Sequence, residues 1–226
     1  MQSEGVIIDA GGSGMKRLYI VGAGGFGREV AWLVERINRQ SPAWELVGFI
    51  DDDLQKIGTK QDNYSVIGDC EYLTLQSEEC WIVCAIGSPV VRKAIVERLK
   101  QLPNVKFATL IDPSVLMSDR IQIGEGSIVC AGSILTVDIK LGRHSIVNLD
   151  CTVGHDVEFG DYLTAYPSVN ISGSVFGGDC VEIGTGVQIR QGLKIVSNVV
   201  MGAGAVVVSD ITEPGTYVGV PVRRIH

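Results

Sequence analysis

Several features that would assign this chain to a specialised class are absent from its sequence. No apolar run approaches the roughly 20 residues that cross a bilayer, and no charged-then-apolar leader stands at the start. We therefore expect no membrane span and a cytoplasmic location. Basic residues are also few: the chain has 19 Lys and Arg against 26 Asp and Glu, which gives a net charge of -7. That balance argues against nucleic-acid binding, which needs a basic surface.

Cysteine and histidine are sparse and scattered. The six cysteines form no CxxC pair and no short secreted framework: Cys70, Cys80, Cys84, Cys130, Cys151 and Cys180. We expect free, mostly buried thiols. The three histidines are His144, His155 and His226.

What the sequence does contain is a repeat. Residues 111–212 divide into seventeen six-residue blocks without insertion. Sixteen of the seventeen first positions are apolar, against 46% of the whole chain, and the second position is glycine in seven blocks. The fifth positions are all aliphatic or small. A helical face cannot produce this register, because its apolar positions recur at three and four residues and drift against a period of six.

Strand alternation explains the repeat. The fifth position and the next first position are two residues apart, so both point to one side of an extended segment. The glycine-tolerant second to fourth positions must then supply a bend. Stacked turns of such blocks bury a continuous aliphatic column that no block could bury alone. The sequence therefore predicts a β-solenoid.

Blocks such as Ile123-Gly-Glu-Gly-Ser-Ile and Leu141-Gly-Arg-His-Ser-Ile resemble the hexapeptide-repeat acyltransferases. The resemblance implies a left-handed parallel β-helix with three blocks in each triangular coil, so that seventeen blocks make between five and six coils. It also implies a homotrimer that binds acetyl-coenzyme A (acetyl-CoA) in a groove between neighbouring subunits.

The first half of the chain has a different pattern. Apolar runs at residues 17–21, 46–50, 81–86 and 107–110 alternate with two helical stretches, the second beginning at Pro89 after a potential N-cap, Ser88. Such alternation predicts a small Rossmann-like α/β domain with a parallel sheet. We expect a flexible extension or tag remnant at residues 1–15, this domain at 16–108 and the solenoid at 109–226.

A glycine turn follows the first expected strand. Gly22, Gly24 and Gly27 match the dinucleotide-binding fingerprint, and Asp51 to Asp53 begin 24 residues after its last glycine. A domain of this size holds only one of the two halves that a dinucleotide spans, which weakens an NAD-dehydrogenase interpretation. A nucleotide-sugar fits better, with its phosphates at the turn amides and helix N-terminus. Tight packing of a helix on a strand is the purely structural alternative.

The order of these motifs narrows the resemblance. The glycine turn, Phe49-Ile-Asp-Asp, Ala85-Ile-Gly, Leu110-Ile-Asp-Pro-Ser and the hexapeptide region together resemble bacterial nucleotide-sugar acetyltransferases of the sialic acid O-acetyltransferase and bacillosamine-type N-acetyltransferase group. This resemblance covers residues 16–225. It implies that the first domain binds the nucleotide-sugar through Gly22, Ala23, Gly24, Gly25, Phe26, Asp51, Asp52 and Gly87.

His155 is the catalytic candidate. It lies at an expected bend, followed by Asp156 and preceded seven residues earlier by Asn148, and this segment resembles the one that carries the family's catalytic histidine. An amine or hydroxyl loses a proton as it attacks a thioester, and imidazole can accept that proton near neutral pH. Asp156 would orient the ring or stabilise the imidazolium. The resemblance implies direct transfer to an amino-sugar, with no acyl-enzyme and no metal.

Bacillosamine-type enzymes carry a second histidine nine residues after the first, where this chain has Thr164. This departure leaves the acceptor sugar open. By resemblance, Gly173 lies near the thioester carbonyl as an oxyanion donor and Ala203 contacts the coenzyme. Arg190, Lys194 and Arg223 are candidates for its phosphates, against the alternative of ordinary solvated charges.

Three other functions stay open. Sialic acid-type O-acetylation would use the same site on a hydroxyl. A zinc carbonic anhydrase, another enzyme class built on this helix, needs three converging histidines where the coils hold two, His144 and His155. A trimeric nucleotide-sugar-binding scaffold with a decayed site is the non-enzymatic alternative, suggested by Thr164.

Overall fold

The computed structural model describes residues 14–226. Most of the extension expected at residues 1–15 lies outside the described residues. Contacts divide the chain into two compact units between Pro113 and Ser114, and each unit is described by itself.

The first unit is an α/β domain. Its strands are β1 (Lys16–Val21), β2 (Trp44–Ile50), β3 (Lys60–Gln61), β4 (Tyr64–Gly68), β5 (Cys80–Cys84), β6 (Val105–Phe107) and β7 (Leu110–Ile111). The helices are α1 (Gly25–Gln40) and α2 (Pro89–Leu99), with 3-10 turns η1 (Leu54–Lys56) and η2 (Cys70–Leu75). In this described part, neither α-helix is long and apolar enough to cross a membrane.

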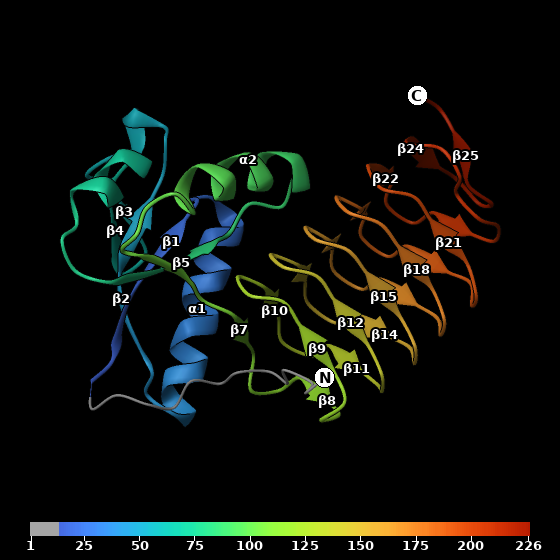
Figure 1. The fold of residues 1–226 in the computed structure, drawn as a ribbon, viewed down its shortest axis with the longest axis horizontal. Helices are drawn as coiled ribbons and strands as arrows, with labels where there is room; N and C mark the ends of the chain where they lie inside the picture. The colour runs from blue at the N-terminus through green and yellow to red at the C-terminus, as the bar shows by residue number, and fades with distance from the viewer. Residues whose placement is uncertain (1–13) are drawn as a thin grey trace. The chain divides into compact units, whose positions relative to one another are not determined.

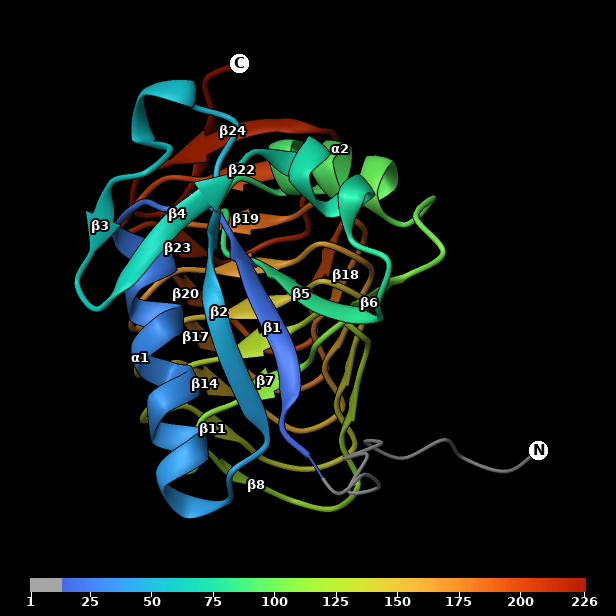
Figure 2. The same ribbon diagram turned by 90° about the vertical axis from the view of Figure 1, so that its left-hand side faces the viewer.

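The sheet runs in the order β3-β4-β2-β1-β5-β6, as Figure 2 shows. β1 pairs in parallel with both β2 and β5, so the strand order reverses at β1. The sheet is mixed rather than wholly parallel, because β3 and β4 form an antiparallel hairpin at one edge. Ligands of such sheets bind at the carboxyl ends of the strands where the order reverses. Gly22 and Ala85, which follow β1 and β5, lie at this position.

The second unit is the predicted solenoid (Figure 1). In this unit each hexapeptide block from Met117 to Val207 contributes one short strand that ends at the block's first position, which confirms the predicted register. Within this unit the strands are β8 (Leu116–Met117), β9 (Gln122–Ile123), β10 (Ile128–Val129), β11 (Ile134–Leu135), β12 (Lys140–Leu141), β13 (Ile146–Val147), β14 (Thr152–Val153), β15 (Glu158–Phe159), β16 (Thr164–Ala165), β17 (Asn170–Ile171), β18 (Phe176–Gly177), β19 (Glu182–Ile183), β20 (Gln188–Ile189), β21 (Lys194–Ile195), β22 (Val199–Met201) and β23 (Val206–Val207).

These strands form three parallel sheets, one on each side of the solenoid. One contains β22-β19-β16-β13-β10, the second β23-β20-β17-β14-β11-β8 and the third β21-β18-β15-β12-β9. Every partner lies 18 residues away, as Thr152 pairs with Asn170 and Val153 with Ile171. Three blocks therefore make one coil. β24 (Gly215–Val218) extends the first sheet in parallel, and β25 (Arg223–Arg224) pairs with it in antiparallel orientation.

The bends have one recurrent conformation. The fourth position of every block from Gly126 to Gly204 has a positive φ, whether the residue is glycine, aspartate or serine. Aspartate and asparagine tolerate this left-handed region better than most residues because their short side chains bond locally. His144 and Tyr162 also adopt it, and their rings stack with centroids 5.3 Å apart.

Gly177 breaks the apolar pattern of first positions for a steric reason. A Cβ at this position would lie 2.1 Å from Cε1 of Phe159, its neighbour in the adjacent coil. Phe159 is 4% exposed, and its ring occupies the space that a side chain at 177 would need. The large Phe159 side chain thus fills the core space that an apolar side chain at position 177 would otherwise occupy.

Candidate active site

The corner between β14 and β15 carries His155 and Asp156. Asp156 has a φ of 59°, the left-handed conformation that recurs at these bends. His155 Nδ1 and Asp156 Oδ2 lie 2.7 Å apart. The backbone is held from both sides, because Asp156 N–H donates to Val137 O and His155 O accepts from Ser174 N–H. The bend therefore lets these two adjacent side chains meet.

This pair has the properties of an accessible base. The side chains of His155 and Asp156 are 53% and 58% exposed, so a ligand can reach them. A neutral imidazole that donates Nδ1–H to the carboxylate leaves Nε2 as a proton acceptor.

Gly173 lies against the His155 ring in the next coil. A Cβ at residue 173 would come within 2.5 Å of both Cε1 and Nε2 of His155. Only a glycine leaves the ring where it is. The structure therefore brings three predicted residues, His155, Asp156 and Gly173, to one corner.

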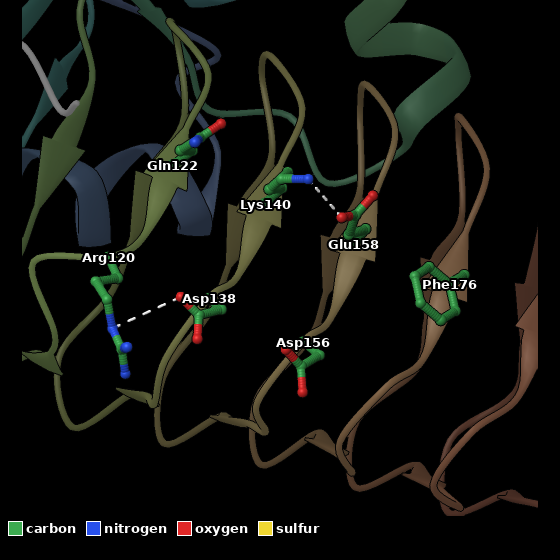
Figure 3. Close-up of a pocket in the computed structure, with 7 residues that line it drawn as sticks. All are labelled: Arg120, Gln122, Asp138, Lys140, Asp156, Glu158 and Phe176. Carbon is green, nitrogen blue, oxygen red and sulfur yellow. Dashed lines mark hydrogen bonds and ion pairs between the residues drawn. The ribbon is translucent and has the colours of Figure 1, made fainter. Parts of the chain in front are cut away.

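A groove of about 340 Å³ adjoins this corner (Figure 3). Side chains from consecutive coils line it: Arg120, Gln122, Asp138, Lys140, Asp156, Glu158 and Phe176. Lys140 Nζ lies 2.6 Å from Glu158 Oε1, and Arg120 Nε lies 3.6 Å from Asp138 Oδ1. Phe176 is 42% exposed and lies beyond Glu158 along the groove. Sequence reasoning missed this groove, although the 18-residue spacing of its members was visible.

Two other predicted positions lie elsewhere. Asn148 follows β13 and stands at the preceding corner, so one chain does not place it beside His155. Asn148 is 6% exposed, and its Oδ1 accepts Leu149 N–H at 2.7 Å. Thr164 lies in β16 and is fully buried.

The coenzyme candidates occupy several places on the solenoid. Arg190 lies at the His155 corner two coils further on, and Lys194 is the strand neighbour of Phe176. Ala203 follows β22, at the same kind of corner as Asn148, with its amide packed against Gly184. Arg223 lies in β25 and, like Arg190 and Lys194, is exposed. One chain does not gather these residues into a single site.

The glycine turn of the first unit has the geometry of its motif. Gly22 has a φ of 106° and its N–H donates to Ile50 O at 2.7 Å. A Cβ on Gly27 would lie 2.0 Å from Gly22 O, so α1 packs on β1 only with glycine there. Gly24, the N-cap of α1, and Gly25 are exposed, with nothing within 4 Å of an added Cβ. Phe26 follows in the first turn of α1, where backbone N–H groups can bind an anion.

Asp51 holds this turn through a hydrogen bond from the backbone of Ala23. Its Oδ2 accepts Ala23 N–H at 2.8 Å and Lys56 Nζ at 3.0 Å, while Oδ1 accepts Asp53 N–H at 3.0 Å. Burial alone would raise the pKa of Asp51, but these hydrogen bonds and the Lys56 charge hold it below its ordinary value. Lys56 was not predicted from the sequence, where nothing distinguishes it from other surface lysines.

Asp52 and Gly87 also have partners within the unit. Asp52 accepts Cys70 N–H at 2.9 Å and Arg98 Nη2 at 2.6 Å. Burial would raise the pKa of Asp52, and these two bonds more than offset it, so the pKa lies below its ordinary value. Gly87 O accepts from Arg92 Nη1 at 2.9 Å.

Cysteine and metal chemistry find little support among residues 14–226. All six thiols are free and buried, as predicted. Burial raises the pKa of Cys151 to about 11 and the pKa of Cys84 to about 12. In this described part, no group of three His, Cys, Asp or Glu side chains is arranged to hold a metal ion.

Comparison with known proteins agrees with both units. Residues 17–99 match the family model described as the PglD N-terminal domain. The acetyltransferase domain of PglB from Neisseria gonorrhoeae FA1090, solved in complex with acetyl coenzyme A, is 32% identical and superimposes with a TM-score of 0.85. The match covers 94% of this chain and all of that one. This chain belongs to the bacterial nucleotide-sugar acetyltransferases of the hexapeptide-repeat family.

Other members of this acetyltransferase family agree. WeeI from Acinetobacter baumannii AYE is 30% identical with a TM-score of 0.83, over 94% of this chain and 100% of that one. GDP-perosamine N-acetyltransferase from Escherichia coli O157:H7 is 29% identical over 77% of this chain and 78% of its own length. The solenoid is accordingly the left-handed parallel β-helix of hexapeptide acetyltransferases, as predicted.

Proposed function

We propose that this acetyltransferase moves the acetyl group of acetyl-CoA onto the amino group of a nucleotide-activated amino-sugar, with His155 as general base. The observation that carries the proposal is the exposed His155–Asp156 pair, 2.7 Å apart, beside Gly173 and the groove. The identity of the E. coli relative as a GDP-perosamine N-acetyltransferase and the acetyl coenzyme A complex of the PglB domain support the two substrates.

The proposed reaction is a direct transfer. The amine nitrogen attacks the thioester carbon while Nε2 of His155 accepts the amine proton. The carbon–sulfur bond then breaks, and the coenzyme thiolate leaves and is protonated. The Gly173 amide is the proposed oxyanion donor. An acyl-cysteine intermediate is disfavoured because the thiols are buried and those of Cys70, Cys84 and Cys151 have pKa values raised to about 11 or 12.

The substrates are assigned to different units. The nucleotide-sugar is assigned to the glycine turn, where exposed Gly24 and Gly25 open the N-terminus of α1 to phosphate. Asp51 and Asp52 then act mainly by holding the turn and its neighbouring loop, since both carboxylates already accept hydrogen bonds within the unit. The enzyme is proposed to work in the cytoplasm.

A homotrimer completes the proposal. His155 and Asn148 lie at different corners of one solenoid, and of the coenzyme candidates Arg190 lies at the first kind of corner and Ala203 at the second. Packing three solenoids side by side would bring the His155 corner of one chain to the Asn148 corner of another. We assign acetyl-CoA to the groove between these two corners of neighbouring chains. Its candidate contacts are Ala203, Arg190, Lys194 and Arg223.

An acceptor panel tests the function. Purified protein is incubated with acetyl-CoA and UDP-, GDP- or dTDP-linked 4-amino-sugars, with the matching 4-hydroxy sugars as controls. We expect free thiol release and an amide product with at least one amino-sugar. Ester formation on a hydroxy sugar would favour the O-acetyltransferase alternative, and no transfer to any acceptor would refute the proposal.

A further inference from the structure

We propose that Arg92 is a positioning residue for the nucleotide-sugar: its hydrogen bonds to Ile86 and Gly87 fix the segment after β5, which forms one wall of the binding site. This inference rests on the proposed function of the first unit. Arg92 is 0% exposed, and its Nη1 donates to Ile86 O at 2.6 Å and to Gly87 O at 2.9 Å.

Burying the Arg92 side chain at this position costs free energy. Burying a guanidinium requires compensation by hydrogen bonds and charge partners. Arg92 also lies in the first turns of α2, which begins at Pro89, where the helix dipole disfavours a positive charge. A buried aliphatic residue would avoid both costs at this position, since the helix face otherwise buries Pro89, Val96 and Leu99. A role in holding the loop explains why a cation stands there.

The segment that Arg92 holds lies directly against the turn. Ala85 N–H donates to Val21 O at 2.8 Å, which attaches the segment to the end of β1. An added Cβ on Gly22 would lie 3.0 Å from Ala85 O and 3.2 Å from Ile86 Cγ1. A shift of residues 85–87 by even a few tenths of an ångström would therefore change the space around Gly22.

The topology makes this segment relevant to a ligand. β1 and β5 are the neighbours between which the strand order reverses, and the chain leaves their carboxyl ends at Gly22 and Ala85. A ligand at this point contacts both segments. Asp51 holds the first segment through Ala23 N–H, and Arg92 holds the second through two carbonyls. Asp51 and Arg92 thus each hold one of the two segments that border the proposed site.

The first test measures position without ligand. Backbone hydrogen exchange is compared between wild type, Arg92→Lys and Arg92→Met. We expect faster exchange at residues 22–25 and 86–88 in both variants, with unchanged exchange in the solenoid. Arg36→Met is the matched control, because Arg36 lies on α1, the other helix of the same unit, and pairs with Asp112 after β7. Equal exchange at residues 22–25 in wild type and the Arg92 variants would overturn the inference.

The second test measures binding of UDP, GDP and CoA by calorimetry. Losing two charge-assisted hydrogen bonds should weaken binding of the preferred nucleotide by about tenfold in Arg92→Met. CoA affinity should not change, nor should nucleotide affinity in Arg36→Met. Wild-type nucleotide affinity in a folded Arg92→Met protein, or an equal loss for CoA, would contradict the inference. Absent acetyl transfer by wild type would instead remove the proposed function.

Discussion

At the scale of the residue, the contact between Gly173 and His155 is the tightest constraint on the proposed base. A methyl group at 173 would lie within 2.5 Å of the ring atoms that face the reaction. We predict that Gly173→Ala displaces the imidazole and lowers kcat by roughly 100-fold, the scale of general-base catalysis. The melting temperature should change little, because His155 is exposed and can move outward. Steady-state kinetics beside calorimetric melting would check this, and a variant with wild-type kcat would show that the contact is irrelevant.

Asp51 gives a pH-dependent prediction at the same scale. Hydrogen bonds to its carboxylate depress its pKa in the folded state, so the unfolded state binds a proton more readily. The stability contributed by Asp51 is therefore fully present above about pH 4 and is lost as the pH falls through the lower, folded pKa. Asp51→Asn should be less stable than wild type at pH 7, and the difference should shrink below pH 4. Urea unfolding at several pH values would measure it; a constant difference would contradict the assignment.

Individual residues were predictable where chemistry and position coincide. His155 and Asp156 were singled out because their segment resembles the family's catalytic segment, and the repeat register places them at a bend where their side chains meet. Asn148 shared the same segment, but sequence proximity does not show that two corners of a coil point apart. Arg92 left one readable signal, since it falls in the 89, 92, 96 and 99 spacing of a buried helix face. Its hydrogen bonds could not be read from that spacing.

At the scale of the element, stacked corners are joined by side chains as well as by strands. Arg143 N–H donates to Asp161 Oδ1, Asp161 N–H to Asp179 Oδ1 and Asp179 N–H to Ser197 Oγ, each at 2.7–2.9 Å. Residues 18 apart thus cap each other along one edge. These hydrogen bonds explain why polar residues recur at corner positions, where the repeat does not require an apolar residue.

Removing the middle of this series of hydrogen bonds tests its contribution. We predict that Asp179→Ala lowers the free energy of unfolding by about 1 kcal/mol, the typical net value of one hydrogen bond, because Asp161 N–H loses its acceptor. Exposed Asp119 serves as the control, and Asp119→Ala should stay within about 0.5 kcal/mol of wild type. Guanidinium titration would measure both. Equal stability of the two variants would show that the corner bond is replaced by water at no cost.

Elements were predictable in proportion to their periodicity. Every hexapeptide strand was placed correctly because core volume fixes one apolar residue in six. The α/β unit was predicted in outline, yet β3, β4 and η2 were missed. β4 reads Tyr-Ser-Val-Ile-Gly and is too short for alternation to emerge. Its place at the sheet edge depends on pairing with β2, a contact made across intervening sequence.

At the scale of the whole molecule, the divided positions of His155 and Asn148 require more than one chain for the proposed site. We predict a trimer by multi-angle light scattering at micromolar protein. Introducing charge repulsion on the groove face, with Phe176→Asp beside Glu158, should weaken acetyl-CoA binding. Val208→Asp, an equally apolar and exposed position, is the control. A fully active monomer would remove the need for a shared groove.

The most direct test of the account is the kcat/KM for acetyl transfer to the best amino-sugar acceptor in His155→Ala. We predict a loss of roughly 100-fold or more relative to wild type, because the attacking amine loses its proton acceptor. His226→Ala, which removes another exposed histidine, should keep the wild-type value. Wild-type kcat/KM in His155→Ala would contradict the central claim that this corner performs the chemistry.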